Sequence, residues 1–317
     1  MERIVFLDRK TCRVEFRPPR FLHQWQDYDL TRSDEVRERL QDATIAITNK
    51  VPLRAPQLKD LRALRFIAVA ATGVDVVDLD YCRQNNITVS NIPHYTQHSV
   101  PEHVFMLILA LRRNLITYRT AMQAGAWPKS PIFSILDYPI RGVASSTLGI
   151  IGYGELGKGV EQIGRAFGMK VLIAERKHAI DIRSGRVAFE KVLAESDIVT
   201  LHCPLTAETR LLIGSTELSK MQHHALLINA ARGGLVDEQA LANHLRMGLL
   251  GGAGIDVLSQ EPPPADNPLL TLNLPNLIIT PHIGWASEEA VNLLAERLIA
   301  NIEAFVAGYP KNVVNER

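Results

Sequence analysis

Strong charge of either sign is missing from this sequence. Its 317 residues include 35 lysines and arginines against 34 aspartates and glutamates, a net charge of +1. Proteins that bind nucleic acid or anionic membranes carry basic patches, and these charges are spread along the chain instead. We therefore expect a small molecule and other subunits as partners, with no nucleic acid and no membrane.

Cysteine is scarce, and long apolar runs are absent. Cys12, Cys82 and Cys203 are odd in number and far apart, which argues against a disulfide framework and against a zinc site. The apolar run near the N-terminus, within MERIVFLDRK, is too short for a signal peptide or a membrane span. These features favour a cytoplasmic protein without a bound metal.

Apolar residues make up 46% of the chain, and its length favours two domains. Short β-branched runs alternate with stretches of helical length in two series, which predicts two parallel sheets and an α/β fold. The first series lies at residues 4 to 7, 44 to 48, 66 to 70 and 87 to 90, and the second at residues 147 to 152, 169 to 174, 197 to 203, 225 to 231, 253 to 257 and 276 to 280.

Helix signals indicate where the domains divide. Ser33 is a candidate N-cap, and Ser99 to Glu102 has the S-x-x-E form of a capping box, which predicts a second helix start. Helical periodicity from residue 286 to about 308, with no strand after it, indicates that the chain returns to its first domain. We expect residues 1 to 99 plus 285 to 317 to form one domain, and residues 100 to 284 to form an inserted one.

A glycine-rich turn joins a predicted strand to a predicted helix. Gly152, Gly154 and Gly157 form G-x-G-x-x-G. These glycines allow a tight turn, a close approach of the backbone to a pyrophosphate, and close packing of helix on strand. A purely structural turn is the alternative, but the flanking strand and helix favour a dinucleotide. The predicted contacts are Gly152, Tyr153, Gly154, Glu155, Leu156 and Gly157.

Glu175 ends the next predicted strand, 18 residues after Gly157. A carboxylate at this point binds the adenosine ribose hydroxyls and repels a 2′-phosphate. Arg176 and Lys177 follow immediately and suit that phosphate, unless they form only a solvated loop end. NAD is therefore the predicted cofactor, with NADP left open.

Three reactive residue types each follow a predicted strand: Arg232, Glu261 and His282. Because ligands bind at the carboxyl edge of a doubly wound sheet, their convergence on that edge predicts a catalytic site. His202 and Cys203 also follow a strand. A nucleophilic Cys203 would need a paired base and covalent chemistry that nothing else in the sequence suggests, so a packed thiol is favoured.

The motifs together resemble the D-isomer-specific 2-hydroxyacid dehydrogenase family over nearly the whole chain. They are ATGVD, SVPEH, GYGELG, HCPLT, NAARGGLVDE, GAGIDV and TPHIGWAS, and the segments TNKVPL and AERK look most like the glycerate dehydrogenase or hydroxypyruvate reductase branch. The resemblance implies a Rossmann-type cofactor domain inserted into a flavodoxin-like substrate domain. It also implies a homodimer whose contacts are built by residues 113 to 145.

The resemblance implies a role for each reactive residue. His282 would donate a proton to the alkoxide that forms as the nicotinamide delivers hydride to a keto carbon. Glu261 would orient the imidazole and stabilise its cationic form, and Arg232 would bind the substrate carboxylate.

Further contacts follow from the same resemblance. The substrate contacts would be the backbone amides of Thr72 and Gly73, together with Leu53 and Trp285 as residues that shape specificity. The remaining cofactor contacts would be Cys203 and Pro204 on the adenine side, Asp256 near the nicotinamide, and Ala230, Arg232 and His282. Pro101 and Trp285 depart from the small residues usual at their positions, which affects the shape of the pocket and the hinge.

We expect reduction of hydroxypyruvate or glyoxylate to D-glycerate or glycolate. Alternatives are a dehydrogenase for another small acid, and an NAD(H)-sensing, corepressor-like binding protein of the same fold that turns over slowly. The lack of a lysine in ATGVD argues against phosphite oxidation. The chain ends soon after its last predicted helix, so we expect no C-terminal regulatory domain.

Overall fold

The computed structural model describes residues 1–316, which form two compact units. Unit 1 comprises Met1–Tyr95 with Ala286–Arg317, and unit 2 comprises Thr96–Trp285. The boundaries predicted from the sequence, at residues 99 and 284, lie a few residues from these positions. Among residues 1–316, no helix combines the length and the apolar character needed to cross a membrane.

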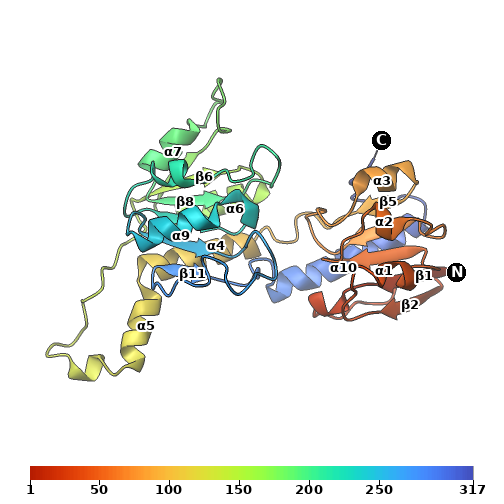
Figure 1. Cartoon of the computed structure of the whole chain (residues 1–317), viewed down its shortest axis with the longest axis horizontal. Helices are drawn as coiled ribbons and strands as arrows, with labels where there is room; N and C mark the ends of the chain where they lie inside the picture. Colours follow the sequence, from red (N-terminus) through yellow and green to blue (C-terminus); the bar gives the residue numbers. More distant parts are fainter. Residues whose placement is uncertain (317) are drawn as a thin grey trace. The chain divides into compact units, whose positions relative to one another are not determined.

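Unit 1 is built on a five-stranded parallel sheet (Figure 1). The strands are β1 (Glu2–Phe6), β2 (His23–Asp27), β3 (Ile45–Thr48), β4 (Phe66–Val69) and β5 (Thr88–Ser90). Their order is β2-β1-β3-β4-β5, which is the flavodoxin-like arrangement. The helical elements of this unit are η1 (Arg9–Thr11), α1 (Val36–Arg39), α2 (Ala55–Leu58), α3 (Leu79–Gln84) and α10 (Glu288–Val306).

Burial explains which strands of unit 1 could be predicted. β3 and β4 are buried along their whole length, as expected for parallel strands covered on both faces. β2 was not predicted, because HQWQD is polar and lies at the sheet edge, where it is only partly buried. The helix predicted to start at Ser33 begins at Val36 instead, and the Ser33 hydroxyl accepts a hydrogen bond from Gln57 Nε2 at 2.8 Å.

Helix α10 brings the last part of the chain into unit 1. The Ser287 hydroxyl accepts a hydrogen bond from the Ala290 N–H at 3.2 Å and so caps the start of the helix. Leu294, Leu298 and Ile302 form a buried stripe at helical spacing. The helix packs against β4.

Unit 2 is built on a six-stranded parallel sheet. Its strands are β6 (Thr147–Ile151), β7 (Lys170–Ile173), β8 (Ile198–Leu201), β9 (Leu226–Asn229), β10 (Gly252–Ile255) and β11 (Leu277–Ile279), in the order β11-β10-β9-β8-β6-β7. An isolated parallel bridge between Ala174 and Val187 follows β7. It is the remnant of the third strand of the Rossmann order 3-2-1-4-5-6.

The predicted fold class is confirmed: both units are doubly wound α/β domains with parallel sheets, one flavodoxin-like and one Rossmann-type. The sheet of unit 2 reverses its strand order between β6 and β8. In open sheets of this kind, ligands bind at the carboxyl ends of the strands beside such a reversal. The helical elements of unit 2 are α4 (Ser99–Arg112), α5 (Leu115–Gln123), η2 (Trp127–Lys129), α6 (Glu155–Ala166), α7 (Phe189–Glu195), α8 (Ser215–Leu218), η3 (Gly233–Leu235) and α9 (Glu238–Arg246).

Helix α4 is largely buried, as its apolar sequence predicts, and packs against α6, β9 and β10. The capping box predicted at its start is wrong in detail. His98 occupies the N-cap position, while the Ser99 hydroxyl donates a hydrogen bond to the Gly284 carbonyl at 2.6 Å. Ser99 therefore ties the start of α4 to the loop that follows β11.

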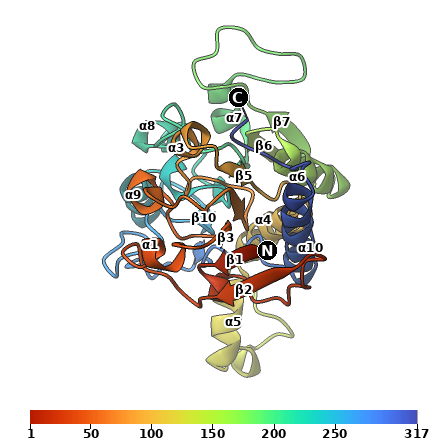
Figure 2. The same cartoon turned by 90° about the vertical axis from the view of Figure 1, so that its right-hand side faces the viewer.

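Residues 113–145 stand apart from the sheet of unit 2, as both views of α5 show (Figures 1 and 2). Many of the large apolar side chains of this segment are exposed: Leu115, Ile116, Met122, Trp127, Ile132, Phe133, Leu136 and Ile140. Phe133 is 90% exposed. A segment that exposes many large apolar side chains is typical of an interaction site.

Candidate active site

The glycine turn between β6 and α6 has the geometry that its sequence predicts. Gly152 has φ of +92°, and a Cβ there would lie 2.4 Å from the Cys203 backbone nitrogen. A Cβ on Gly157 would lie 2.4 Å from the Gly152 carbonyl oxygen, whereas a Cβ on Gly154 would meet nothing within 4 Å. Gly152 and Gly157 thus allow close packing, and Gly154 leaves open space at the start of α6.

A pocket of about 450 Å³ opens beside this turn. Eight predicted cofactor residues line it: Gly152, Tyr153, Gly154, Glu175, Arg176, Lys177, Cys203 and Pro204. Its walls also include residues that were not predicted from the sequence, among them Arg183, Arg186, Thr206 and Glu208. Arg183 and Arg186 lie between β7 and α7, where no motif or periodicity marks them.

Other predicted cofactor residues lie outside this pocket lining. Glu155 is exposed on the first turn of α6, and its carboxylate pairs with Lys158 Nζ at 3.2 Å. Leu156 is partly buried and packs against the apolar core between α4 and α6. Ala230 packs against the same core, at the end of β9.

Glu175 has its carboxylate fully engaged by the protein. One oxygen accepts hydrogen bonds from the Arg176 N–H at 2.8 Å and from Arg183 Nη2, and the other accepts from Arg183 Nε at 2.6 Å. The Arg183 guanidinium holds the pKa of Glu175 at about 2, so the carboxylate is ionised throughout the physiological range.

His202 and Cys203 have the properties of packed groups. Burial lowers the pKa of His202 to about 4, so its imidazole is neutral near pH 7, and Nε2 lies 3.0 Å from the Thr200 hydroxyl. Burial raises the pKa of Cys203 to about 11. Neither an acidic imidazolium nor a nucleophilic thiolate is therefore present here at neutral pH.

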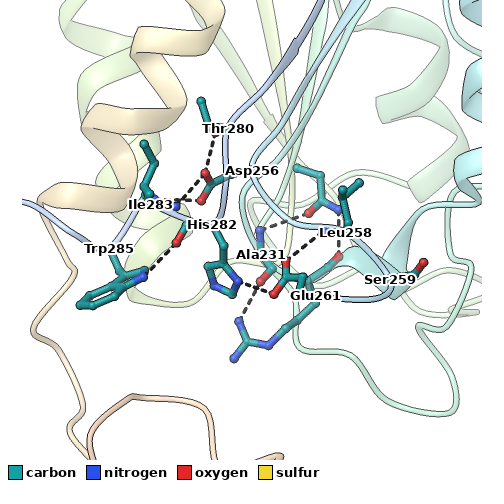
Figure 3. A network of polar contacts seen from close by, with 12 residues as sticks. Ala231, Asp256, Leu258, Ser259, Glu261, Thr280, His282, Ile283 and Trp285 are labelled. Carbon is teal, nitrogen blue, oxygen red and sulfur yellow. Dashed lines mark hydrogen bonds and ion pairs between the residues drawn. The ribbon is translucent and has the colours of Figure 1, made fainter. Parts of the chain in front are cut away.

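The three reactive residues follow three neighbouring parallel strands. Arg232 follows β9, Glu261 follows β10 and His282 follows β11, so all three lie toward the carboxyl edge of one sheet. His282 Nδ1 lies 2.6 Å from Glu261 Oε2 (Figure 3). Glu261 Oε1 accepts a hydrogen bond from the Leu258 N–H at 3.0 Å, which fixes the carboxylate in turn.

Arg232 is held by its neighbours in the chain. Its Nη1 donates a hydrogen bond to the Ala231 carbonyl at 2.7 Å, and its own carbonyl accepts one from Asn229 Nδ2 at 2.8 Å. The side chain is partly exposed. The guanidinium is thus positioned by local backbone contacts at the end of β9.

Asp256 organises the loop that carries His282. This carboxylate is only 2% exposed, and it accepts hydrogen bonds from the Thr280 hydroxyl at 2.6 Å and from the N–H groups of Ile283 at 3.0 Å and Gly284 at 2.8 Å (Figure 3). Burial alone would raise the pKa of Asp256, but these donors and His103 bring it below its usual value. The Asp256 carboxylate, which was predicted to lie near the nicotinamide, therefore accepts its hydrogen bonds from the loop that carries His282.

The same loop gives His282 an unusual backbone conformation. Its φ is +56°, a left-handed value that costs a residue other than glycine about 1–2 kcal/mol. The Trp285 indole N–H donates a hydrogen bond to the His282 carbonyl at 3.0 Å. Asp256 thus holds the backbone that follows His282, and Trp285 holds the His282 carbonyl.

The residues predicted from unit 1 lie in two loops. Thr72 follows β4, where its hydroxyl donates to the Ile92 carbonyl at 2.8 Å and its carbonyl accepts from Asn91 Nδ2 at 2.7 Å, and Gly73 comes next in the same loop. Leu53 is 0% exposed and belongs to the apolar core. A direct contact of the Leu53 side chain with substrate therefore has no support, because packing encloses it.

Comparison with known proteins identifies the family of this chain. Residues 105–284 match the family model described as D-isomer specific 2-hydroxyacid dehydrogenase, NAD binding domain. The chain is 50% identical over 316 residues to a glycerate dehydrogenase from Methylorubrum extorquens, with 99% of each chain covered. It is 37% identical to a hydroxypyruvate reductase from Blautia hydrogenotrophica, with 90% of this chain and 89% of the relative covered.

A solved structure gives the same result. The D-lactate dehydrogenase from Aquifex aeolicus, complexed with NAD and lactic acid, matches with a TM-score of 0.81 and 28% identity, and 99% of each chain is covered. The agreement extends over both units. This chain therefore belongs to the D-isomer-specific 2-hydroxyacid dehydrogenase family, and residues 105–284 contain its NAD-binding domain.

Proposed function

We propose that this enzyme reduces hydroxypyruvate or glyoxylate to D-glycerate or glycolate, with NADH or NADPH as reductant. The observation that carries the proposal is the 2.6 Å contact between His282 and Glu261 at the sheet edge that also holds the glycine turn. A carboxylate-supported imidazole beside a dinucleotide site suits the reduction of a keto group. The glycerate dehydrogenase and hydroxypyruvate reductase relatives support this substrate class.

The residues beside the glycine turn fit a dinucleotide. Gly154 leaves open space at the N-terminus of α6, where backbone N–H groups favour a pyrophosphate. The pocket next to it is large enough for a nucleoside, at about 450 Å³. We propose that Cys203 and Pro204 form one wall for that nucleoside. When bound, the nicotinamide supplies the hydride.

His282 is proposed as the proton donor. Because the Glu261 carboxylate can only accept a hydrogen bond, the proton between them belongs to Nδ1, which leaves Nε2 to face the substrate. As hydride adds to the keto carbon, the carbon–oxygen π pair moves onto oxygen, which takes the Nε2 proton. In the reverse direction the same nitrogen removes that proton.

Arg232 is proposed to bind the substrate carboxylate and to polarise its keto oxygen. A guanidinium presents two parallel N–H donors, which match a carboxylate better than a single ammonium does. We propose that the backbone amides of Thr72 and Gly73 also bind the substrate carboxylate. Glycine is suited to such a role because it allows close backbone approach.

Asp256 and Trp285 are proposed as positioning residues. Asp256 holds the backbone that follows His282, Trp285 holds the His282 carbonyl, and neither needs to touch the substrate to control where the imidazole points. Trp285 is partly exposed and can in addition shape the substrate pocket.

We further propose a cytoplasmic homodimer. The cysteines Cys12, Cys82 and Cys203 are free, as thiols are in a reducing compartment. The exposed apolar side chains of residues 113–145 would be covered by the partner subunit in a dimer.

The decisive experiment is steady-state oxidation of NADH and NADPH against hydroxypyruvate, glyoxylate, pyruvate and 2-ketoglutarate. The proposal expects the highest kcat/KM with hydroxypyruvate or glyoxylate. Tight dinucleotide binding with negligible turnover of all four acids would instead point to a nucleotide sensor or to another substrate.

A further inference from the structure

The cofactor specificity of this enzyme depends on whether the Glu175 carboxylate is available. In NAD-selective Rossmann domains, the acidic residue at the end of the second strand accepts hydrogen bonds from the adenosine ribose hydroxyls. Here the bidentate contact with Arg183 and the Arg176 N–H occupies both carboxylate oxygens. Glu175 is buried, with its side chain 3% exposed, whereas the Arg183 side chain is 56% exposed. The accessible part of this pair is therefore the cation.

Two further guanidinium groups lie beside the pair. Arg186 Nε is 3.9 Å from Glu175 Oε2, and its guanidinium lies over the Tyr153 ring, 5.8 Å from the centroid. Arg176 is exposed and lines the same pocket. Glu175 thus pairs with Arg183 and lies near Arg186, and Arg176 adds a third arginine to this part of the pocket, so the pocket carries net positive charge there.

The other charged groups of the pocket do not cancel this excess. Lys177 Nζ lies 2.9 Å from Glu217 Oε1, so the Glu217 carboxylate balances the charge of this ammonium group. Glu208 lines the pocket from the loop after β8, whereas the three arginines come from the segment after β7. The positive charge of these arginines is therefore concentrated at the end of β7, where the ribose 2′ position of a dinucleotide lies in this fold.

We propose that Arg183 is a specificity-determining residue, which neutralises Glu175 and lets the enzyme bind NADPH at least as tightly as NADH. A 2′-phosphate is a dianion at neutral pH, and guanidinium groups bind phosphate through paired N–H donors. The inference rests on the proposed function only for its choice of ligand. It requires no particular keto acid.

The test measures binding rather than turnover. Dissociation constants for NADH and NADPH are determined by fluorescence titration of the full-length wild type, Arg183→Ala, Arg183→Lys and Glu175→Gln. Arg246→Ala is the matched control, since Arg246 is an exposed arginine of the same unit on α9, outside the pocket. Circular dichroism verifies that each variant is folded.

The expected result is a reversal of preference. Arg183→Ala should weaken NADPH about tenfold or more, which is the loss of one charge-assisted contact, while NADH binding is retained or improved as Glu175 becomes available. Arg183→Lys should fall between wild type and alanine. Glu175→Gln should change NADH binding little, and Arg246→Ala should change neither constant.

Three results would overturn the inference. The first is tighter binding of NADH than of NADPH by the wild type, and the second is an unchanged ratio of the two dissociation constants in Arg183→Ala. The third is a large loss of NADH affinity in Glu175→Gln, which would show that the Glu175 carboxylate leaves Arg183 and binds the ribose. Absence of turnover with every keto acid would contradict the proposed function and leave this inference standing.

Discussion

His282 Nδ1 and Glu261 Oε2 lie 2.6 Å apart, although they are 21 residues apart in the chain and follow different strands. β10 and β11 are neighbours and parallel, so their carboxyl ends meet at one edge. The sheet thus brings a carboxylate to an imidazole, and the contact determines which ring nitrogen is left for the substrate.

Replacement of His282 tests the proton donor. His282→Ala should lower kcat for hydroxypyruvate by about 10²- to 10⁴-fold, which is the usual contribution of a general acid. The dissociation constant for NADH should stay within about twofold, because His282 is outside the pocket beside the glycine turn. Retention of wild-type kcat would remove His282 from the chemistry.

Replacement of Glu261 tests the support of that imidazole. Glu261→Ala removes the acceptor for Nδ1–H, and we expect activity to fall about 10- to 100-fold, by analogy with the carboxylate partners of metal-bound histidines. We expect the loss mainly in kcat, with the KM for hydroxypyruvate nearly unchanged, since Glu261 is not proposed to touch the substrate. Glu261→Asp should restore part of the activity. A rise in the KM for hydroxypyruvate with kcat unchanged would instead indicate a direct role of Glu261 in substrate binding.

Two glycine substitutions separate folding from cofactor binding. Gly152→Ala should lower the melting temperature, because its φ of +92° costs alanine about 1–2 kcal/mol and its Cβ would collide with the Cys203 nitrogen. Gly154→Ala should fold normally, because its Cβ has no neighbour within 4 Å, but should weaken NADH binding by filling that open space. Equal melting temperatures for the two variants would contradict this reading of the turn.

The part of the fold that was predicted is the part with a local signal. β3 and β4 could be located because burial on both faces demands continuous apolar runs. β2 lacks that signal, since an edge strand is stabilised by backbone pairing on one side and tolerates HQWQD. The remnant strand at Val187 is too short to leave any pattern.

The candidate site shows the same division. The glycine turn could be predicted because backbone geometry at Gly152 demands one residue type. The contact of Arg183 with Glu175 could not, because it depends on the path of an irregular loop rather than on periodicity. Leu53 was expected from the family resemblance to shape substrate specificity, whereas its side chain is enclosed in the apolar core of unit 1. Tertiary packing decides whether such an apolar side chain lines a pocket or joins the core, and the sequence around Leu53 does not show that packing.

The Glu175–Arg183 pair should make stability depend on pH. The pKa of Glu175 is about 2 in the folded protein against a usual value of 4.5, so the pair contributes its full stability above about pH 4.5 and loses it as the pH falls toward 2. Arg183→Ala should therefore be less stable than wild type at pH 6, and the difference should shrink below pH 4.5. Urea denaturation from pH 3 to 7 measures it. Arg246→Ala serves as control, and a difference for Arg183→Ala that stays constant over this range would contradict the assignment.

The apolar surface of residues 113–145 leads to a prediction about assembly. A symmetric dimer uses the same surface of each subunit, so a single substitution alters the interface twice. Phe133 is 90% exposed, and Phe133→Glu would bury two carboxylates in that interface, which is costly without partners. We expect the wild type to elute at twice the chain mass in light scattering, and Phe133→Glu to shift toward the monomer. Met247→Glu is the control, because Met247 is 62% exposed but lies outside the segment. A wild-type monomer, or equal dissociation in both variants, would contradict an interface built on residues 113–145.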